Sequence, residues 1–273
     1  MTRLRLSLLA LFGALAAPAV CHAQAEEPQD WTLTRVDDRQ ATVATIDFTT
    51  GLGLVARCMD GVYDLIILGL PDASRSATTR ELGLSVGEDS DLRTTVWTVG
   101  DKRSTAFSRV PAMVARQLAE GGKLQLVVPG AEGQPRTRYV MDLDPSSTAL
   151  EQTLTDCGRP LVDPRDRDIE GNGQDGLPGG VNWAQAPRPR FPFPVGGRSP
   201  TLGYVVMSCG VQATGQLTAC QTESEQPAGY HLGRSVEASL DRARVQLTPS
   251  GVVSGKPLEG RLILFTVNFR MRP

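Results

Sequence analysis

The chain has 273 residues, with 28 Lys and Arg, 30 Asp and Glu, and a formal net charge of −2. This balance lacks the basic excess typical of nucleic-acid-binding proteins, so no nucleic acid partner is expected. The charge is unevenly divided: residues 26–187 carry sixteen basic and twenty-five acidic side chains, and the part from Arg188 onward carries ten and five. That basic part could favour acidic protein segments or anionic envelope polymers, although two ordinarily charged surfaces would give the same counts.

The first 25 residues have the pattern of a bacterial secretory signal peptide. Arg3 and Arg5 precede an apolar run from Leu6 to Val20, and residues 23–25 (Ala-Gln-Ala) offer a cleavage site. The run is shorter than the ~20 apolar residues that span a bilayer. We therefore expect a cleaved signal and a periplasmic protein. A retained membrane anchor and a lipoprotein modified at Cys21 are the alternatives.

Four cysteines remain after cleavage: Cys58, Cys157, Cys209 and Cys220. An even number in an oxidising compartment indicates two disulfides, and four cysteines allow three pairings. We favour Cys58–Cys157 and Cys209–Cys220, because each bridge then lies within one expected domain. Free buried thiols are the alternative.

Residues 26–158 are expected to form a mostly antiparallel β domain with two short helices. Apolar positions alternate along several short segments, and Met59-Asp60-Gly61 separates two of them as a hairpin turn. The expected strands cover Ala41–Phe48, Leu52–Cys58, Val62–Leu70, Leu92–Val99, Lys123–Val128 and Arg136–Leu143.

The two helices are expected over Pro111–Glu120 and from about Thr148 to Thr155. The first has a proline in its first turn and ends at two glycines. In the second, Leu150, Leu154 and Cys157 recur at helical spacing, so the cysteine should face the core. This orientation supports a buried bridge to Cys58.

Residues 159–189 are expected to be a linker, because they are rich in Asp, Arg, Gly and Pro and lack apolar periodicity. A small domain should follow over residues 190–273, giving an α+β chain overall. Its expected elements are strands at Leu202–Val211 and Gln216–Ser224, a helix with Leu232, Val236, Leu240 and Ala243 on one face, a loop from Pro249 to Pro257, and a last strand at Arg261–Met271.

This strand-strand-helix-strand order after a proline-aromatic segment resembles the C-terminal domain of TonB. The matching residues are Phe191-Pro192-Phe193-Pro194, Gly203-Tyr204-Val205-Val206, Thr214-Gly215-Gln216-Leu217, the segment from Ser224 to Pro227, Gly255-Lys256-Pro257 and Val267-Asn268-Phe269. The resemblance covers about a third of the mature chain. The N-terminal half is faintly similar to periplasmic proteins of the invasion-associated locus B type, through Trp31, Cys58 and Cys157.

The TonB resemblance implies that the last strand recruits an extended partner segment by β-strand addition. Of its two side-chain rows, the more apolar row is expected to face the core: Ile263, Phe265, Val267 and Phe269. The opposite row then faces outward as the partner-binding set: Leu262, Leu264, Thr266 and Asn268. A strand with a purely structural role is the alternative.

The chain departs from an energy transducer in three respects. Its N-terminal segment is expected to be cleaved, a globular domain precedes the TonB-like one, and the linker has only ~30 residues, a reach of about 90 Å when extended. The cysteine pair Cys209 and Cys220 is also an addition to the family pattern. Energy transduction would require the N-terminal segment to remain in the membrane.

Catalysis is not expected. His231 is the one histidine outside the signal segment, which leaves no support for a Ser-His-Asp arrangement or a zinc site. The acidic clusters Asp37-Asp38, Glu88 to Asp91 and Asp142 to Asp144 could suit a hydrolase, but aromatics for sugar stacking make up 5% of the chain. Asp166, Asp168 and Glu170 imitate a calcium loop, whose twelfth position is Leu177 instead of Glu. No cofactor or metal is therefore expected.

These features predict a periplasmic, non-catalytic binding or adaptor protein that engages an envelope protein through its C-terminal domain. A structural envelope scaffold or oligomerisation protein is the main alternative.

Overall fold

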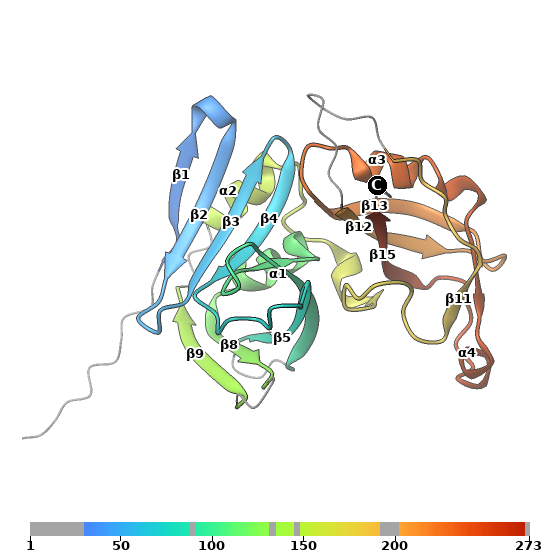
Figure 1. Ribbon diagram of the computed structural model, residues 1–273, viewed down its shortest axis with the longest axis horizontal. Coiled ribbons are helices and arrows are strands. Elements are labelled where there is room, and N and C mark those ends of the chain that lie inside the picture. Colours follow the sequence, from blue (N-terminus) through green and yellow to red (C-terminus); the bar gives the residue numbers. More distant parts are fainter. Residues whose placement is uncertain (1–29, 88–90, 131–134, 145–147, 192–201, 271–273) are drawn as a thin grey trace, which may run out of the picture.

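The computed structural model describes residues 30–87, 91–130, 135–144, 148–191 and 202–270. The expected signal segment lies outside these ranges. Strands predominate and the helices are short, so the chain has mixed α+β content as expected. A nine-stranded sheet forms the N-terminal part and a four-stranded sheet the C-terminal part (Figure 1). Within the described ranges, no helix is long and apolar enough to cross a membrane.

The N-terminal sheet has the strand order β1-β2-β3-β4-β7-β6-β5-β8-β9, and all neighbouring strands are antiparallel. Its strands are β1 (Thr32–Val36), β2 (Ala41–Asp47), β3 (Gly53–Met59), β4 (Val62–Leu68), β5 (Thr79–Val86), β6 (Arg93–Val99), β7 (Ala106–Ser108), β8 (Gly122–Val128) and β9 (Thr137–Leu143). Six of these correspond to predicted strands. The sequence reading missed β1, β5 and β7.

The turn between β3 and β4 forms at the predicted residues. Met59 pairs with Val62, so Asp60 and Gly61 make a two-residue loop. Their φ angles of 52° and 75° are both positive, as a type I′ turn requires. Aspartate tolerates this region better than most residues, and glycine has no Cβ to clash.

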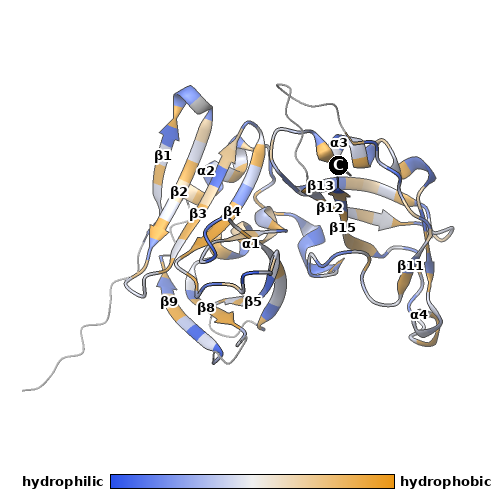
Figure 2. Ribbon diagram, in the orientation of Figure 1, coloured by the Kyte–Doolittle hydropathy of each residue, from blue (hydrophilic) through white to orange (hydrophobic). Residues whose placement is uncertain are grey.

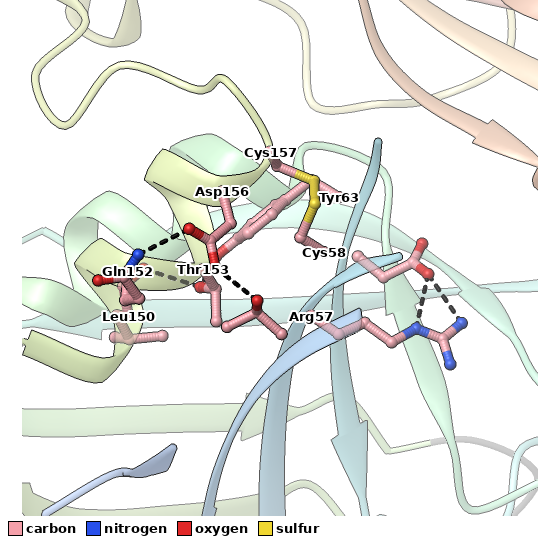
Figure 3. The surroundings of a disulfide bond; sticks show 10 residues. Arg57, Cys58, Tyr63, Leu150, Gln152, Thr153, Asp156 and Cys157 are labelled. Atoms are coloured by element: carbon pink, nitrogen blue, oxygen red, sulfur yellow. Dashed lines mark hydrogen bonds and ion pairs between the residues drawn. A yellow bond between two sulfur atoms is a disulfide. The ribbon is translucent and has the colours of Figure 1, made fainter. Parts of the chain in front are cut away.

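Helices α1 (Pro111–Ala119) and α2 (Thr148–Asp156) confirm the two predicted helices and pack against the sheet. The Cys58–Cys157 disulfide joins β3 to the residue after α2, with a Cα–Cα distance of 5.3 Å. Beside it, the hydroxyls of Tyr63 and Thr153 lie 3.0 Å apart, and Thr42 donates to Asp156 (Figure 3). The bridge therefore lies among contacts that already hold α2 on the sheet.

The C-terminal sheet has the order β10-β15-β12-β13. Its elements are β10 (Ile169–Glu170), β12 (Leu202–Val211), β13 (Leu217–Gln226) and β15 (Leu262–Arg270), with helix α3 (Leu232–Glu237) and a two-stranded ribbon of β11 (Val181–Gln185) and β14 (Arg244–Leu247). The second disulfide, Cys209–Cys220, joins β12 to β13. Both favoured cysteine pairings are confirmed.

Side chains are buried on both faces of the C-terminal sheet. On one face, Val205, Ile263 and Phe265 form a core with α3 and the β11–β14 ribbon. On the other, Val206 and Leu264 belong to the large core of the N-terminal part. Burial of both faces explains the nearly continuous apolar runs of β12 and β15, visible as orange segments in Figure 2.

Three sequence expectations differ from the structure. Helix α3 ends at Glu237, and Leu240 and Ala243 are buried beyond it in a 3-10 turn and a short connection. The expected loop from Pro249 contains helix α4 (Pro249–Val253), and β14 precedes it. The expected linker contains β10, β11 and a 3-10 turn at Pro164–Arg167. Short elements of this kind depend on tertiary partners and leave little periodicity in the sequence.

Candidate functional site

The structure places the four expected partner-binding side chains in different surroundings. Asn268 is exposed and Leu262 is half-buried, but Leu264 and Thr266 are only 2% and 6% exposed. The expectation that this row faces solvent is therefore wrong for Leu264 and Thr266, because Leu264 packs in the core of the N-terminal part and Thr266 contacts residues 173–176. The opposite row faces the core as expected at Ile263, Phe265 and Phe269.

The backbone of these same residues points toward the outer edge of β15. The Thr266 N–H donates to the Gly176 carbonyl at 3.4 Å, on the side away from β12. Because N–H groups alternate in direction along a strand, those of Leu264 and Asn268 point the same way. The predicted partner-binding residues Leu264, Thr266 and Asn268 therefore have backbone N–H groups directed to the side where a strand would be added.

β15 is not an open edge strand over its whole length, which corrects the expectation from the sequence. Ile169 and Glu170 of β10 pair in parallel with Leu262 and Ile263. We call residues 163–176 the strap. It is mostly hydrophilic and lies between the two sheets (Figures 1 and 2). The strap occupies the first half of the edge that strand addition would use.

An ion cluster fixes the strap to the start of β15. The Glu170 carboxylate accepts from Arg261 Nε at 3.0 Å and lies 2.9 Å from Lys256 Nζ. The Arg261 side chain is only 6% exposed. Burial raises the pKa of Glu170, but hydrogen bonds and charge from Arg261 and Lys256 outweigh this, so its pKa lies below the usual value. Glu170 is therefore ionised at neutral pH.

A second cluster joins the strap to the N-terminal part. The buried Arg109 guanidinium donates to the Gly173 carbonyl at 2.8 Å and to Asp175 Oδ1 at 2.9 Å. It also lies over the Tyr204 ring, 4.7 Å from the centroid, which is cation–π range. The Val96 N–H donates to the Asn172 carbonyl at 2.7 Å. The strap is thus bound by both parts of the molecule.

A cleft of about 620 Å³ begins where the strap ends. Its lining combines Asp175, the end of β15 at Asn268 to Arg270, the start of β12, the end of β13 at Gln226, and residues of the N-terminal part. Leu202, 60% exposed, contributes an apolar side chain to it. The cleft therefore lies over the ends of β13, β12 and β15, on the face turned toward the N-terminal part, and reaches the outer edge of β15 at Asp175 and Asn268.

The structure also places the calcium-like segment and His231, the groups that the sequence offered for metal binding or catalysis. Asp166 accepts hydrogen bonds from Arg116 and Glu170 from Arg261, so two of the three carboxylates of the calcium-like segment are engaged by arginines. His231 precedes α3 with a left-handed φ of 55°. Over the described ranges, no group of three or more His, Cys, Asp or Glu side chains is placed to hold a metal ion.

The sequence reading missed Arg109, Glu170, Asp175 and Arg261 as a connected set. Glu170 was considered only as a calcium ligand, and its arginine partner lies 91 residues away. A usable signal was present: charged residues interrupted by glycines in the strap, and an arginine directly before an apolar strand. Neither feature indicates which basic side chain forms an ion pair with which carboxylate.

Comparisons with known proteins returned no match: no protein family, no curated protein and no solved structure corresponds to this chain. The similarity to the TonB C-terminal domain stays a prediction.

Proposed function

We propose that this protein is an exported, non-catalytic binding protein of the bacterial envelope. Its TonB-like C-terminal domain engages an extended segment of another envelope protein by strand addition along β15. The two disulfides support residence in an oxidising compartment, since such bonds seldom persist in the cytosol. We assign that compartment to the periplasm on the basis of the signal-like N-terminus.

One observation carries the proposal. The outer edge of β15 already pairs with an extended segment of its own chain, and beyond Thr266 it continues into the 620 Å³ cleft. Strand addition takes its affinity from main-chain hydrogen bonds and its specificity from side-chain pockets. The outward N–H groups of β15 supply the first, and the cleft that reaches this edge at Asp175 and Asn268 supplies the second.

The test is site-specific photo-cross-linking of the full chain in the periplasm of expressing cells. A photo-reactive residue replaces Asn268, which is exposed at the cleft, or Gln246, which is exposed on β14. Position 268 is expected to form an adduct with an extended segment of one envelope protein, and position 246 is not. Adducts with a second copy of this chain would support a scaffold function instead. No difference between the positions would refute the proposal.

A matched pair of variants tests the main-chain contribution. Asn268→Pro removes the outward N–H, which does not belong to the β12 ladder, whereas Asn268→Ala keeps it. The proline variant should lose the partner and the alanine variant should retain it, provided that both melt like the wild type. Equal binding by both variants would refute strand addition at this edge.

A further inference from the structure

The strap occupies the edge of β15 in the manner of a bound peptide. Ile169 and Glu170 pair with Leu262 and Ile263, and the Gly176 carbonyl accepts from the Thr266 N–H. The Thr266 hydroxyl also donates to the Gly173 carbonyl at 3.3 Å. Any segment that adds to the whole of β15 must first displace these contacts.

Displacement requires little backbone pairing to be broken. β10 has two residues, and the hydrogen bond to Gly176 is long at 3.4 Å. Strap backbone with so few ladder bonds can open locally at a free energy well below that of global unfolding. Its charged anchors therefore contribute much of what holds the strap: Asp166 with Arg116 lies near its start, and Glu170 with Arg261 and Asp175 with Arg109 lie beside the β15 edge.

The buried Arg261 side chain determines which chemical group a segment that displaces β10 must carry. If β10 left and nothing replaced Glu170, Arg261 would remain buried without its carboxylate, which is strongly unfavourable. Lys256 adds a second positive charge at the same point. An incoming segment avoids this penalty when it carries a carboxylate in the register of Glu170.

We infer that the strap is an intramolecular competitor for the β15 edge, and that the partner is an extended peptide with an apolar residue followed by Glu or Asp. These two residues would take the places of Ile169 and Glu170. The inference rests on the proposed function, since it specifies the partner and the regulation of the same edge. The strap keeps the edge closed until such a segment displaces it.

The test compares two full-chain double variants of equal charge. The release variant, Glu170→Gln with Asp175→Asn, removes the two anchors that lie beside the β15 edge. The control, Asp168→Asn with Glu259→Gln, changes two exposed carboxylates instead. The probe is a fluorescein-labelled peptide with the sequence of residues 165–174, and a second peptide carries Gln in place of its Glu. Fluorescence anisotropy measures binding, and hydrogen exchange follows the Leu264 and Thr266 amides.

The release variant should bind the Glu peptide at least ten-fold more tightly than the wild type and the control variant do. The Gln peptide should bind at least ten-fold more weakly, because it leaves Arg261 without an anion. The Leu264 and Thr266 amides should exchange faster in the release variant and regain protection when the Glu peptide is added. Unchanged melting of the core would exclude global unfolding as the cause.

Each contrary result has a distinct meaning. Equal binding of the Glu peptide by wild type and release variant would overturn the competitor role and leave strand addition standing. Equal binding of both peptides would overturn the acidic specificity. Unchanged exchange in the release variant would show that the anchors do not hold the strap. Faster exchange without any peptide binding would refute the proposed function together with the inference.

Discussion

Removing the two disulfides one at a time should have clearly unequal effects. In the chain-entropy account, a bridge stabilises by restricting the unfolded chain, and the effect grows with the loop that it closes. The Cys58–Cys157 and Cys209–Cys220 bridges span 99 and 11 residues. For these lengths we expect losses of about 4.7 and about 2.8 kcal/mol in the free energy of unfolding.

The structure makes the two pairs well matched for this comparison. In each pair one cysteine is buried, Cys58 or Cys209, and the other is half-buried. The packing lost in the paired Cys→Ala variants is therefore similar, and the difference of about 2 kcal/mol reports mainly the loop length. The losses in Tm should be roughly 9–19 °C for the long loop and roughly 6–11 °C for the short one.

Urea unfolding of the wild type and both double variants, followed by circular dichroism, measures these differences. The two parts of the chain share one core through Val206 and Leu264, so a single transition is expected. Reduced wild-type protein serves as the control that lacks both bridges. If loss of the short bridge were as costly as loss of the long one, the entropic reasoning would fail for this protein.

Three further predictions concern the contact between the sheets. Leu264→Ala should lower the free energy of unfolding by about 2–5 kcal/mol, as for a buried leucine, in urea unfolding; a change below about 1 kcal/mol would contradict its burial. Tyr204→Phe should leave stability unchanged or raise it by about 1 kcal/mol, because the buried hydroxyl has no partner of normal geometry among the described residues; a marked loss would reveal a missed hydrogen bond. The pKa of Glu170 is lowered from 4.5 on folding, so its stabilisation is present above that pH and is lost as pH falls through the folded value. The Tm difference between wild type and Glu170→Gln should therefore shrink below pH 4.5, and a difference independent of pH would contradict the ion pair.

Local patterns predicted the regular elements well where short-range chemistry decides them. The Asp60-Gly61 turn forms because both residues accept positive φ, and α1 begins at Pro111, where a missing N–H costs nothing. Most strands with alternating apolar positions were recognised, but β5, in which Leu82, Leu84 and Val86 alternate, was missed. β7 was missed because three residues carry no readable period.

The candidate site could be predicted from the sequence only in part. The residues whose backbone faces the outer edge of β15 could be identified from the strand itself, because alternation fixes them. The apolar run Ile263-Leu264-Phe265 indicates burial on both faces, yet the sequence reading assigned Leu264 to solvent by choosing the more apolar row. A continuous run does not say which second layer covers it.

The sequence by itself gave the export-like N-terminus, the turn at Asp60-Gly61, the mixed α+β content and the favoured one of three disulfide pairings. Each of these follows from residue type and spacing within a short window, or from an even count of cysteines divided between two domains. Only the tertiary structure decided that the expected linker is a strap, that Glu170 meets Arg261, and that the C-terminal sheet is covered on both faces. The ion pair alone joins residues 91 positions apart along the chain. Long-range charge and packing choices of this kind depend on which surfaces fold against each other, and local propensity does not encode that choice.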